Sequence, residues 1–285
     1  MNKISLKSNH FFANISKIGA ELLQVQNTVV NQPYLWSVDT NFWNRVSPNL
    51  FPIVGRLKND QYQYGNQTFQ MLQHGFARNL EFELANSTEN SVSLILKSNE
   101  ETRKSYPFDF VFEISYILVD NNLDVHYRIT NCSQETMPCS VGAHPAFALN
   151  EPLENFLLVF DQPFIANRHL IDGGLYTGLS EPVIDGNTLQ LNSELIQNDA
   201  IVFKKPPFYS VTLQHVSGQK LVTVSSSDFQ YWGFWSKPGA PFFCIEPWAG
   251  LADSIDSNGN LFEKEGIQLV EPNQSVSFSY SIEFH

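Results

Sequence analysis

The stretch FDFVFEISYILVDNNLDVHYRIT, residues 108–130, decides the fold class of this chain of 285 residues. Apolar side chains occupy every second position on both sides of Asp120-Asn121-Asn122, whose composition is typical of a turn. A period of two predicts strands that are buried on one face. The stretch therefore predicts a long antiparallel hairpin.

The same period recurs along the rest of the chain. Apolar residues alternate again from Val276 to Phe284, and residues 62–71 predict a shorter hairpin around Gly65-Asn66. Further strands are expected at residues 4–7, 20–26, 91–97, 156–160, 209–214, 219–224 and 242–246.

Helical signals are weak, and they predict only short helices at residues 100–106 and 193–196. No linker, composition break or repeat divides the chain. The sequence therefore predicts an all-β protein, a large antiparallel β-sandwich in which residues 1–285 form a single domain.

Composition excludes several classes of protein. The net charge of −12 disfavours nucleic acid and anionic membranes as partners. The three cysteines, Cys132, Cys139 and Cys244, provide neither a disulfide framework nor CxxC metal spacing. The N-terminus lacks the apolar segment of a signal peptide, and no stretch reaches the ~20 apolar residues of a membrane helix. We expect a cytoplasmic monomer or homodimer that binds a small molecule.

Two short segments place a histidine next to small residues. QHGFAR, residues 73–78, carries His74 and Arg78 beside Gly75. Taken alone, this pattern slightly favours a surface loop in which the arginine is solvated and the histidine caps a turn. In VGAHPAF, residues 141–147, His144 lies between small residues and a proline, which leaves its ring unobstructed. Histidine exchanges protons near neutral pH, so His144 is a candidate acid or base. The alternative is a histidine buried in the core.

A third segment, FFCIEPWAG at residues 242–250, places Glu246 at the end of an apolar strand. Partial burial there would raise the pKa of the carboxyl group toward the range useful for a base. An exposed Trp248 would offer a flat surface for the C–H face of a sugar. The alternative is a solvated charge at a strand end. Arg56 and Asp199 are weaker candidates, each beside an apolar run.

Together these segments resemble the aldose 1-epimerase (galactose mutarotase) family over nearly the whole chain. GAHPAF and CIEPWAG are the most specific motifs, whereas FPIVGR, QHGFAR and EPWAGLAD are similar to the LacX-like branch. QHGFAR is also similar to the hexose-6-phosphate epimerases. The resemblance implies a large β-sandwich that interconverts the α and β anomers of a hexose or hexose 6-phosphate.

The resemblance also implies a role for each matching residue. Glu246 matches the general base and His144 the general acid. The matching substrate-binding positions are Arg56, Gln73, His74, Arg78 and Asp199. The segment around His74 has fewer Asn and Gly residues than in typical galactose mutarotases, so galactose is not singled out as the substrate.

The chemistry of anomer exchange needs two proton movements, one off the C1 hydroxyl and one onto the ring oxygen. A Glu246 carboxylate can take the first proton and a His144 imidazolium can give the second, without metal or cofactor. Ordinary pKa values of ~4.3 and ~6.5 would give a narrow pH optimum. A broad optimum would require a nearby negative charge, such as that of Asp199, to raise the pKa of His144.

Several alternatives remain open from the residues alone. Arg56 and Arg78, helped by Lys58, could bind a phosphate, or the arginines could position sugar hydroxyls or pair with local acids. Glu246 and Asp253 could be the two carboxylates of a glycosidase.

Two further alternatives concern non-catalytic and metal-dependent roles. His74, His144 and His215 could form a metal site, but no HxH or HxxxH spacing in the sequence supports it. A non-catalytic carbohydrate-binding domain is also possible, but such a domain has no need for both Glu246 and His144.

Overall fold

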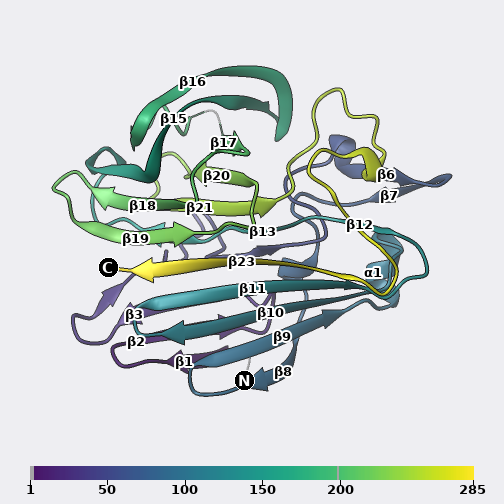
Figure 1. Cartoon of the computed structure of the whole chain (residues 1–285), viewed down its shortest axis with the longest axis horizontal. Helices are drawn as coiled ribbons and strands as arrows, with labels where there is room; N and C mark the ends of the chain where they lie inside the picture. Colours follow the sequence, from purple (N-terminus) through teal and green to yellow (C-terminus); the bar gives the residue numbers. More distant parts are fainter. Residues whose placement is uncertain (1–2, 198) are drawn as a thin grey trace.

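The computed structural model describes residues 3–197 and 199–285. Its largest layer is a nine-stranded sheet whose neighbouring strands are antiparallel (Figure 1). In spatial order, the strands are β16 (Leu175–Gln190), β15 (Phe156–Asp172), β18 (Ser210–His215), β19 (Lys220–Ser225), β23 (Ser275–Phe284), β11 (Asn122–Asn131), β10 (Phe110–Val119), β9 (Ser91–Lys97) and β8 (Glu83–Ser87).

A six-stranded sheet forms the second layer. Its strands are β17 (Ile201–Lys204), β20 (Tyr231–Trp235), β21 (Phe242–Ala249), β13 (Val141–Ala143) and β5 (Asn49–Leu50), with β14 (Ala146–Ala148) also paired to β21.

Smaller elements complete the described part of the chain. A four-stranded sheet contains β1 (Lys3–Lys7), β2 (Phe11–Ser16), β3 (Leu22–Asn27) and β4 (Gln32–Pro33). Two strand pairs are β6 (Gln61–Tyr64) with β7 (Gln67–Gln70) and β12 (Met137–Cys139) with β22 (Gln268–Val270). The helical elements are α1 (Glu100–Ser105) and the 3-10 turns Lys58–Asp60, Ala77–Asn79, Leu153–Asn155 and Leu261–Glu263.

The predicted all-β class is confirmed, and so is the hairpin that predicted it. β10 and β11 pair in unbroken register from Phe110 opposite Asn131 to Val119 opposite Asn122. Asp120 in the connecting turn adopts φ 49°, a conformation that Asp and Asn tolerate better than most residues. The helix predicted at residues 100–106 is α1, but the segment 193–196 forms a turn rather than a helix.

The main core lies between the two large sheets. Phe112 and Ile114 of β10 belong to the same buried apolar cluster as Phe243 and Ile245 of β21. Packing of two sheets through their apolar faces is the arrangement expected of a sandwich.

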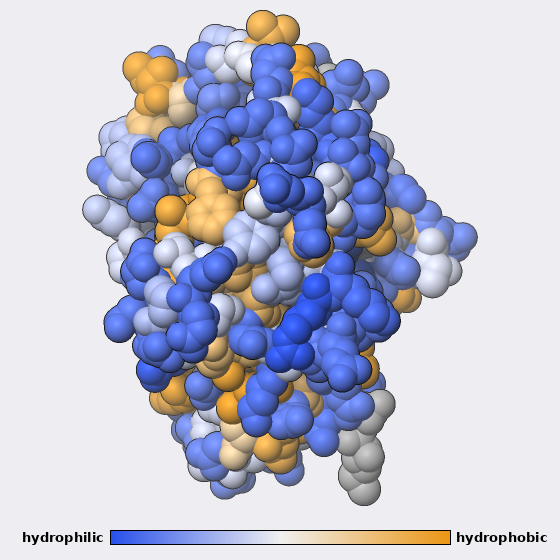
Figure 2. All heavy atoms as spheres, turned by 90° about the vertical axis from the view of Figure 1, so that its right-hand side faces the viewer, coloured by the Kyte–Doolittle hydropathy of each residue, from blue (hydrophilic) through white to orange (hydrophobic). Residues whose placement is uncertain are grey.

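One face of the molecule can be compared with the polar composition of the chain. The face shown in Figure 2 is mostly hydrophilic, with hydrophobic side chains in scattered patches. Among the described residues, no helix has both the length and the apolar character needed to cross a membrane.

Strand β21 separates the core from a second face of the six-stranded sheet. Side chains alternate along a strand, so Cys244, Glu246 and Trp248 point away from Phe243 and Ile245. Cys244 and Trp248 belong to two smaller apolar clusters, distinct from the main core. Glu246 therefore lies between two apolar patches on the face of the sheet that is not used for the main core.

Candidate active site

A pocket of 410 Å³ opens on this second face of the six-stranded sheet. Its volume is within the range of small-molecule sites. The pocket brings together residues that are far apart in the sequence, namely Gln73, His74, Arg78, His144, Asp199, Glu246 and Trp248. Gln73 and Asp199 are exposed at the pocket, whereas His74, His144 and Glu246 are buried.

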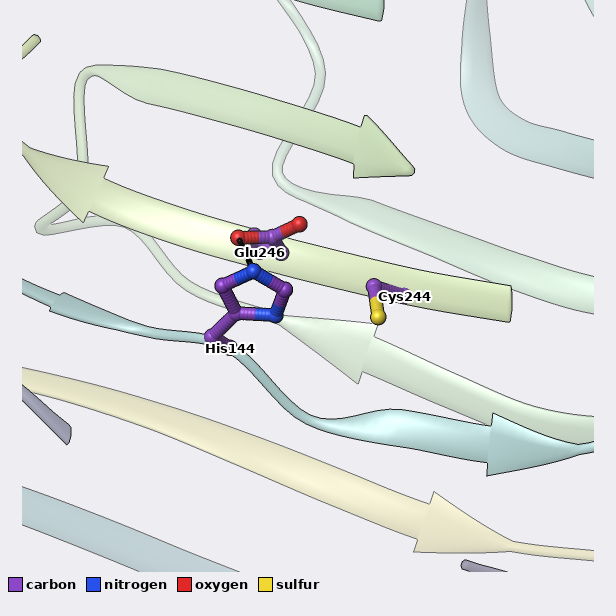
Figure 3. Close-up of side chains that lie close together, drawn as sticks. All are labelled: His144, Cys244 and Glu246. Atoms are coloured by element: carbon purple, nitrogen blue, oxygen red, sulfur yellow. Dashed lines mark ion pairs between the residues drawn. The ribbon is translucent and has the colours of Figure 1, made fainter. Parts of the chain in front are cut away.

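Strand register places His144 opposite Glu246. Gly142 of β13 pairs with Trp248 and Ala146 of β14 pairs with Cys244, so the segment between them passes Glu246. His144 Nε2 lies 3.2 Å from Glu246 Oε2. Figure 3 shows the two side chains facing each other. Glu246 is 1% exposed and His144 is 8% exposed, which removes both groups from bulk water.

Burial shifts the pKa values of Glu246 and His144 in opposite directions. Loss of water, followed by the negative charge of Asp199, raises the pKa of Glu246 well above its ordinary value. Burial lowers the pKa of His144 to about 3. In the empty pocket, burial thus favours a neutral imidazole on His144 and a protonated carboxyl group on Glu246. The raised Glu246 pKa has the predicted direction, whereas the pKa of His144 is lowered and not raised, as a broad pH optimum would have required.

The pair should make protein stability fall above about pH 6.5. Unfolded Glu246 and His144 have ordinary pKa values of 4.5 and 6.5, so together they bind no proton above that pH. The folded pair still binds one proton at any pH above 6.5 that is below the raised pKa of Glu246. The free energy of unfolding should therefore fall by up to ~1.4 kcal/mol per pH unit in this window.

Urea unfolding of wild type and Glu246→Gln between pH 6.5 and 8.5 measures this contribution. The variant lacks the titrating carboxyl group, so the difference in stability between the two proteins should change with pH. A constant difference across the window would contradict the protonation state assigned to the pair.

His74 is a neutral hydrogen-bond donor facing the pocket. The backbone N–H of Gly55 donates to His74 Nδ1 at 3.1 Å, so the ring proton must be on Nε2. Burial lowers the pKa of His74 well below its ordinary value, and the neighbouring His144 and Arg78 act in the same direction. Gly75 is needed next to it because a Cβ there would lie 2.3 Å from the carbonyl oxygen of Phe51.

Unsatisfied polar atoms concentrate at the pocket. Among the described residues, buried side-chain atoms without a hydrogen-bond partner include Arg78 Nε, His144 Nδ1, Glu246 Oε2 and Trp248 Nε1. All four residues line the pocket. Each buried polar atom without a hydrogen bond costs about 1–3 kcal/mol. A ligand rich in hydroxyl groups could supply the missing partners, so these four atoms favour such a ligand.

Two tryptophans near His144 were missed by the sequence analysis. Trp43 stacks on the His144 ring with centroids 4.8 Å apart, and Trp235 meets its edge at 5.7 Å. Trp235 pairs with Cys244, so the alternation of β20 could have placed it on the pocket face. Trp43 lies in a loop between β4 and β5, and no periodic pattern predicts its position.

Trp248 is more buried than predicted, at 6% exposure. Its ring packs against Gly142 and Gly233, where an added Cβ would lie 2.6 and 2.5 Å from ring atoms. The prediction of an exposed platform is therefore wrong for Trp248, which forms part of the pocket lining.

Arg56 does not line the pocket, and its guanidinium group is bound elsewhere. Its Nε and Nη2 donate to the two carboxylate oxygens of Asp60 at 2.9 and 2.8 Å. The structure thus favours the predicted alternative of a local acid partner. Arg78 does line the pocket, with Nη2 donating to the backbone oxygen of Gln73 at 2.7 Å. The two arginines therefore do not form a joint phosphate clamp.

The structure does not bring together the residues of two other predicted sites, the glycosidase pair and the three-histidine metal site. Asp253 is buried outside the pocket, where its carboxylate accepts from Lys264 Nζ at 2.8 Å and from the Lys58 N–H at 3.0 Å. This position contradicts a glycosidase pair with Glu246. His215, the last residue of β18, hydrogen-bonds Ser217 and does not line the pocket with His74 and His144.

A different set of possible metal ligands consists of His144, Cys244 and Glu246 (Figure 3). Their ligand atoms lie within 4.8 Å of one another. Metals bind the thiolate rather than the thiol, but burial raises the pKa of the Cys244 thiol well above its ordinary value. Burial likewise favours a protonated Glu246. This neutral donor set fits a cation poorly.

Comparisons with known proteins agree with one another. The model of the family described as aldose 1-epimerase matches residues 2–267. The plasmid and chromosomal LacX proteins of Lactococcus lactis subsp. lactis are each 31% identical over 296 residues, covering 98% of this chain and 98% of theirs.

Solved structures with the same fold include two similar proteins from lactobacilli. A galactose mutarotase related enzyme from Lactobacillus acidophilus is 33% identical, with a TM-score of 0.94 over 99% of this chain and 97% of that chain. A galactose mutarotase-like protein from Lactobacillus casei ATCC 334 is 30% identical, with a TM-score of 0.94 over 99% of this chain and 100% of that chain.

Proposed function

The chain belongs to the aldose 1-epimerase family, an isomerase family that acts on sugars, and we propose that it interconverts the α and β anomers of an unphosphorylated hexose through Glu246 and His144. One observation carries the proposal. A carboxyl group and an imidazole, both buried, face each other at 3.2 Å in a pocket with unsatisfied polar atoms. A protein that only binds sugar gains nothing from such a pair.

The geometry suits ring opening because both reacting oxygens are attached to the same carbon. The C1 hydroxyl and the ring oxygen therefore lie close enough together for adjacent side chains to reach both. Glu246 takes the hydroxyl proton, the bond from C1 to the ring oxygen breaks, and His144 donates a proton to that oxygen. The product is the open-chain aldehyde. Each positioned group typically contributes ~10²–10⁴-fold to the rate.

Rotation about C1–C2 then presents the other face of the aldehyde, and the proton movements reverse. The pair ends with the single proton with which it began. In the empty pocket, burial favours this proton on Glu246. A bound sugar donates to Glu246 and accepts from His144, so it favours the carboxylate and imidazolium forms needed for catalysis.

The remaining pocket residues are proposed to hold the sugar. His74 offers its Nε2–H as a donor, Asp199 offers a carboxylate, and Gln73 and Arg78 offer further polar groups. Stacked beside His144, Trp43 offers an apolar surface for a C–H face.

Charge at the pocket favours a neutral sugar over a phosphosugar. Of the described arginines, Arg78 lines the pocket and Arg56 is bound to Asp60. Lys237 also lines the pocket, but its Nζ donates to the backbone oxygens of Asn41 and Phe42 at 3.1 and 3.0 Å. A phosphate would also face the carboxyl groups of Glu246 and Asp199, which repel it when ionised.

The test is two-dimensional NMR exchange between the α and β anomeric signals. We expect faster exchange of glucose or galactose, and a kcat/KM for glucose 6-phosphate that is at least about 10-fold lower. Equal or better use of glucose 6-phosphate, lost selectively in Arg78→Gln, would contradict the neutral-sugar proposal. Sugar binding without faster exchange would identify a carbohydrate-binding protein instead.

A further inference from the structure

One wall of the pocket comes from the tip of a long hairpin. Strands β15 and β16 curve together over β17 and β20 (Figure 1). Near the tip, Ile171, Gly174 and Tyr176 line the pocket, whereas Glu246 and His144 are carried by the six-stranded sheet and its connection. The position of the tip therefore sets the shape of the pocket without moving the reacting pair.

Arg56 joins this tip to the body of the protein. Its Nη1 donates to the carbonyl oxygen of Gly173 at 3.0 Å, while Nε and Nη2 bind Asp60. Gly174 has φ 82°, and a Cβ there would lie 3.2 Å from Arg56 Cδ. The arginine stem thus lies against the tip, and Asp60 orients the guanidinium group that holds it.

A second set of hydrogen bonds holds the hairpin tip at Tyr176. The Tyr176 N–H donates to the Asp253 carbonyl oxygen at 2.9 Å, and the Ile255 N–H donates to the Tyr176 carbonyl oxygen at 2.9 Å. The Asp253 N–H in turn donates to the Arg56 carbonyl oxygen at 2.8 Å. Lys264 holds the Asp253 carboxylate from a buried position. Both attachments of the tip therefore meet at Arg56.

We propose that Arg56 and Asp60 form a positioning clamp for sugar binding, which holds Gly174 and Tyr176 in the pocket wall without contacting the sugar. The kinetic part of this inference rests on the proposed function. A loosened wall weakens binding of the ground state and the transition state alike, so KM rises while kcat is kept.

The kinetic test uses Arg56→Gln, Asp60→Asn and the double variant. Each single change should raise KM for the hexose by about 3- to 10-fold and leave kcat within about twofold, and the double variant should be no worse than either. Arg56→Lys keeps the positive charge but has one donor nitrogen in place of three, so its KM should be intermediate. If Asp60→Asn leaves KM unchanged while Arg56→Gln raises it, Asp60 has no part in positioning the tip and the two-residue clamp is wrong.

Arg103→Gln is the matched control. It removes another exposed ion pair, that of Arg103 with Asp109, whose residues do not line the pocket. This change should leave KM unaltered. A KM rise equal to that of Arg56→Gln would show that loss of any surface pair has this effect, and would overturn the clamp.

Hydrogen exchange tests the clamp without relying on catalysis. The amides of Tyr176 and Ile255 should exchange faster in Arg56→Gln and Asp60→Asn than in wild type, and should be unchanged in Arg103→Gln. Faster amide exchange in a protein that does not exchange anomers would support the clamp and refute the proposed function. Unchanged amides together with unchanged KM in an active protein would refute the clamp alone.

Discussion

Replacing Glu246 with glutamine should lower kcat for anomer exchange by about 10²–10⁴-fold while the protein remains folded. Glutamine has the shape of the protonated carboxyl group that burial favours at this position, but it cannot accept the proton of the C1 hydroxyl. KM should change little, since the pocket keeps its shape. NMR exchange gives kcat, and thermal unfolding at neutral pH should show no loss of stability.

Cys244→Ala provides the control for this variant. Cys244 lies two residues before Glu246 on the same face of β21 but does not line the pocket. The change leaves a small cavity and should cost stability while keeping kcat. A Glu246→Gln protein that retains more than a tenth of wild-type kcat would rule out Glu246 as the base.

Replacing His144 with glutamine should cause a loss of similar size, about 10²–10⁴-fold in kcat. Glutamine can place an amide near the position of Nε2, which faces Glu246, but it cannot transfer a proton to the ring oxygen. The double variant with Glu246→Gln should be little slower than either single variant, because the two residues exchange protons in one step.

Additive losses in that double variant would show that the two residues act independently. His74→Gln is the useful comparison, since His74 also lies buried beside His144. His74 is proposed to donate a hydrogen bond rather than transfer a proton. Its replacement should therefore raise KM more than it lowers kcat.

The regular strands could be predicted from the sequence because their side chains alternate between core and solvent. The hairpin from Phe110 to Asn131 follows directly from this alternation. The long hairpin of β15 and β16 does not. Pro163, Gly178 and Gly186 interrupt its pattern, and the pairing continues through register shifts such as that between Val159 and Phe164. Such irregularities are tolerated at a sheet edge, where β16 lies.

The site could be predicted only in part for a related reason. His144 and Glu246 could be chosen for their residue types and neighbours, but the 3.2 Å between them depends on how β13 and β14 pair with β21. The direction of the His144 pKa also depends on how deeply that pairing buries the ring. Likewise, the bond from Arg56 to Gly173 joins residues 117 positions apart, which no local pattern reveals.

Alternate positions of strand β21 serve two different purposes, packing of the core and lining of the pocket. Phe243 and Ile245 face the main core, while Glu246 and Trp248 face the pocket. Natural selection for a folded, abundant protein therefore acts mainly on one set of positions, and selection for a particular substrate acts mainly on the other. A lineage with this strand can evolve a new sugar preference through mutations that leave the interior of the sandwich untouched.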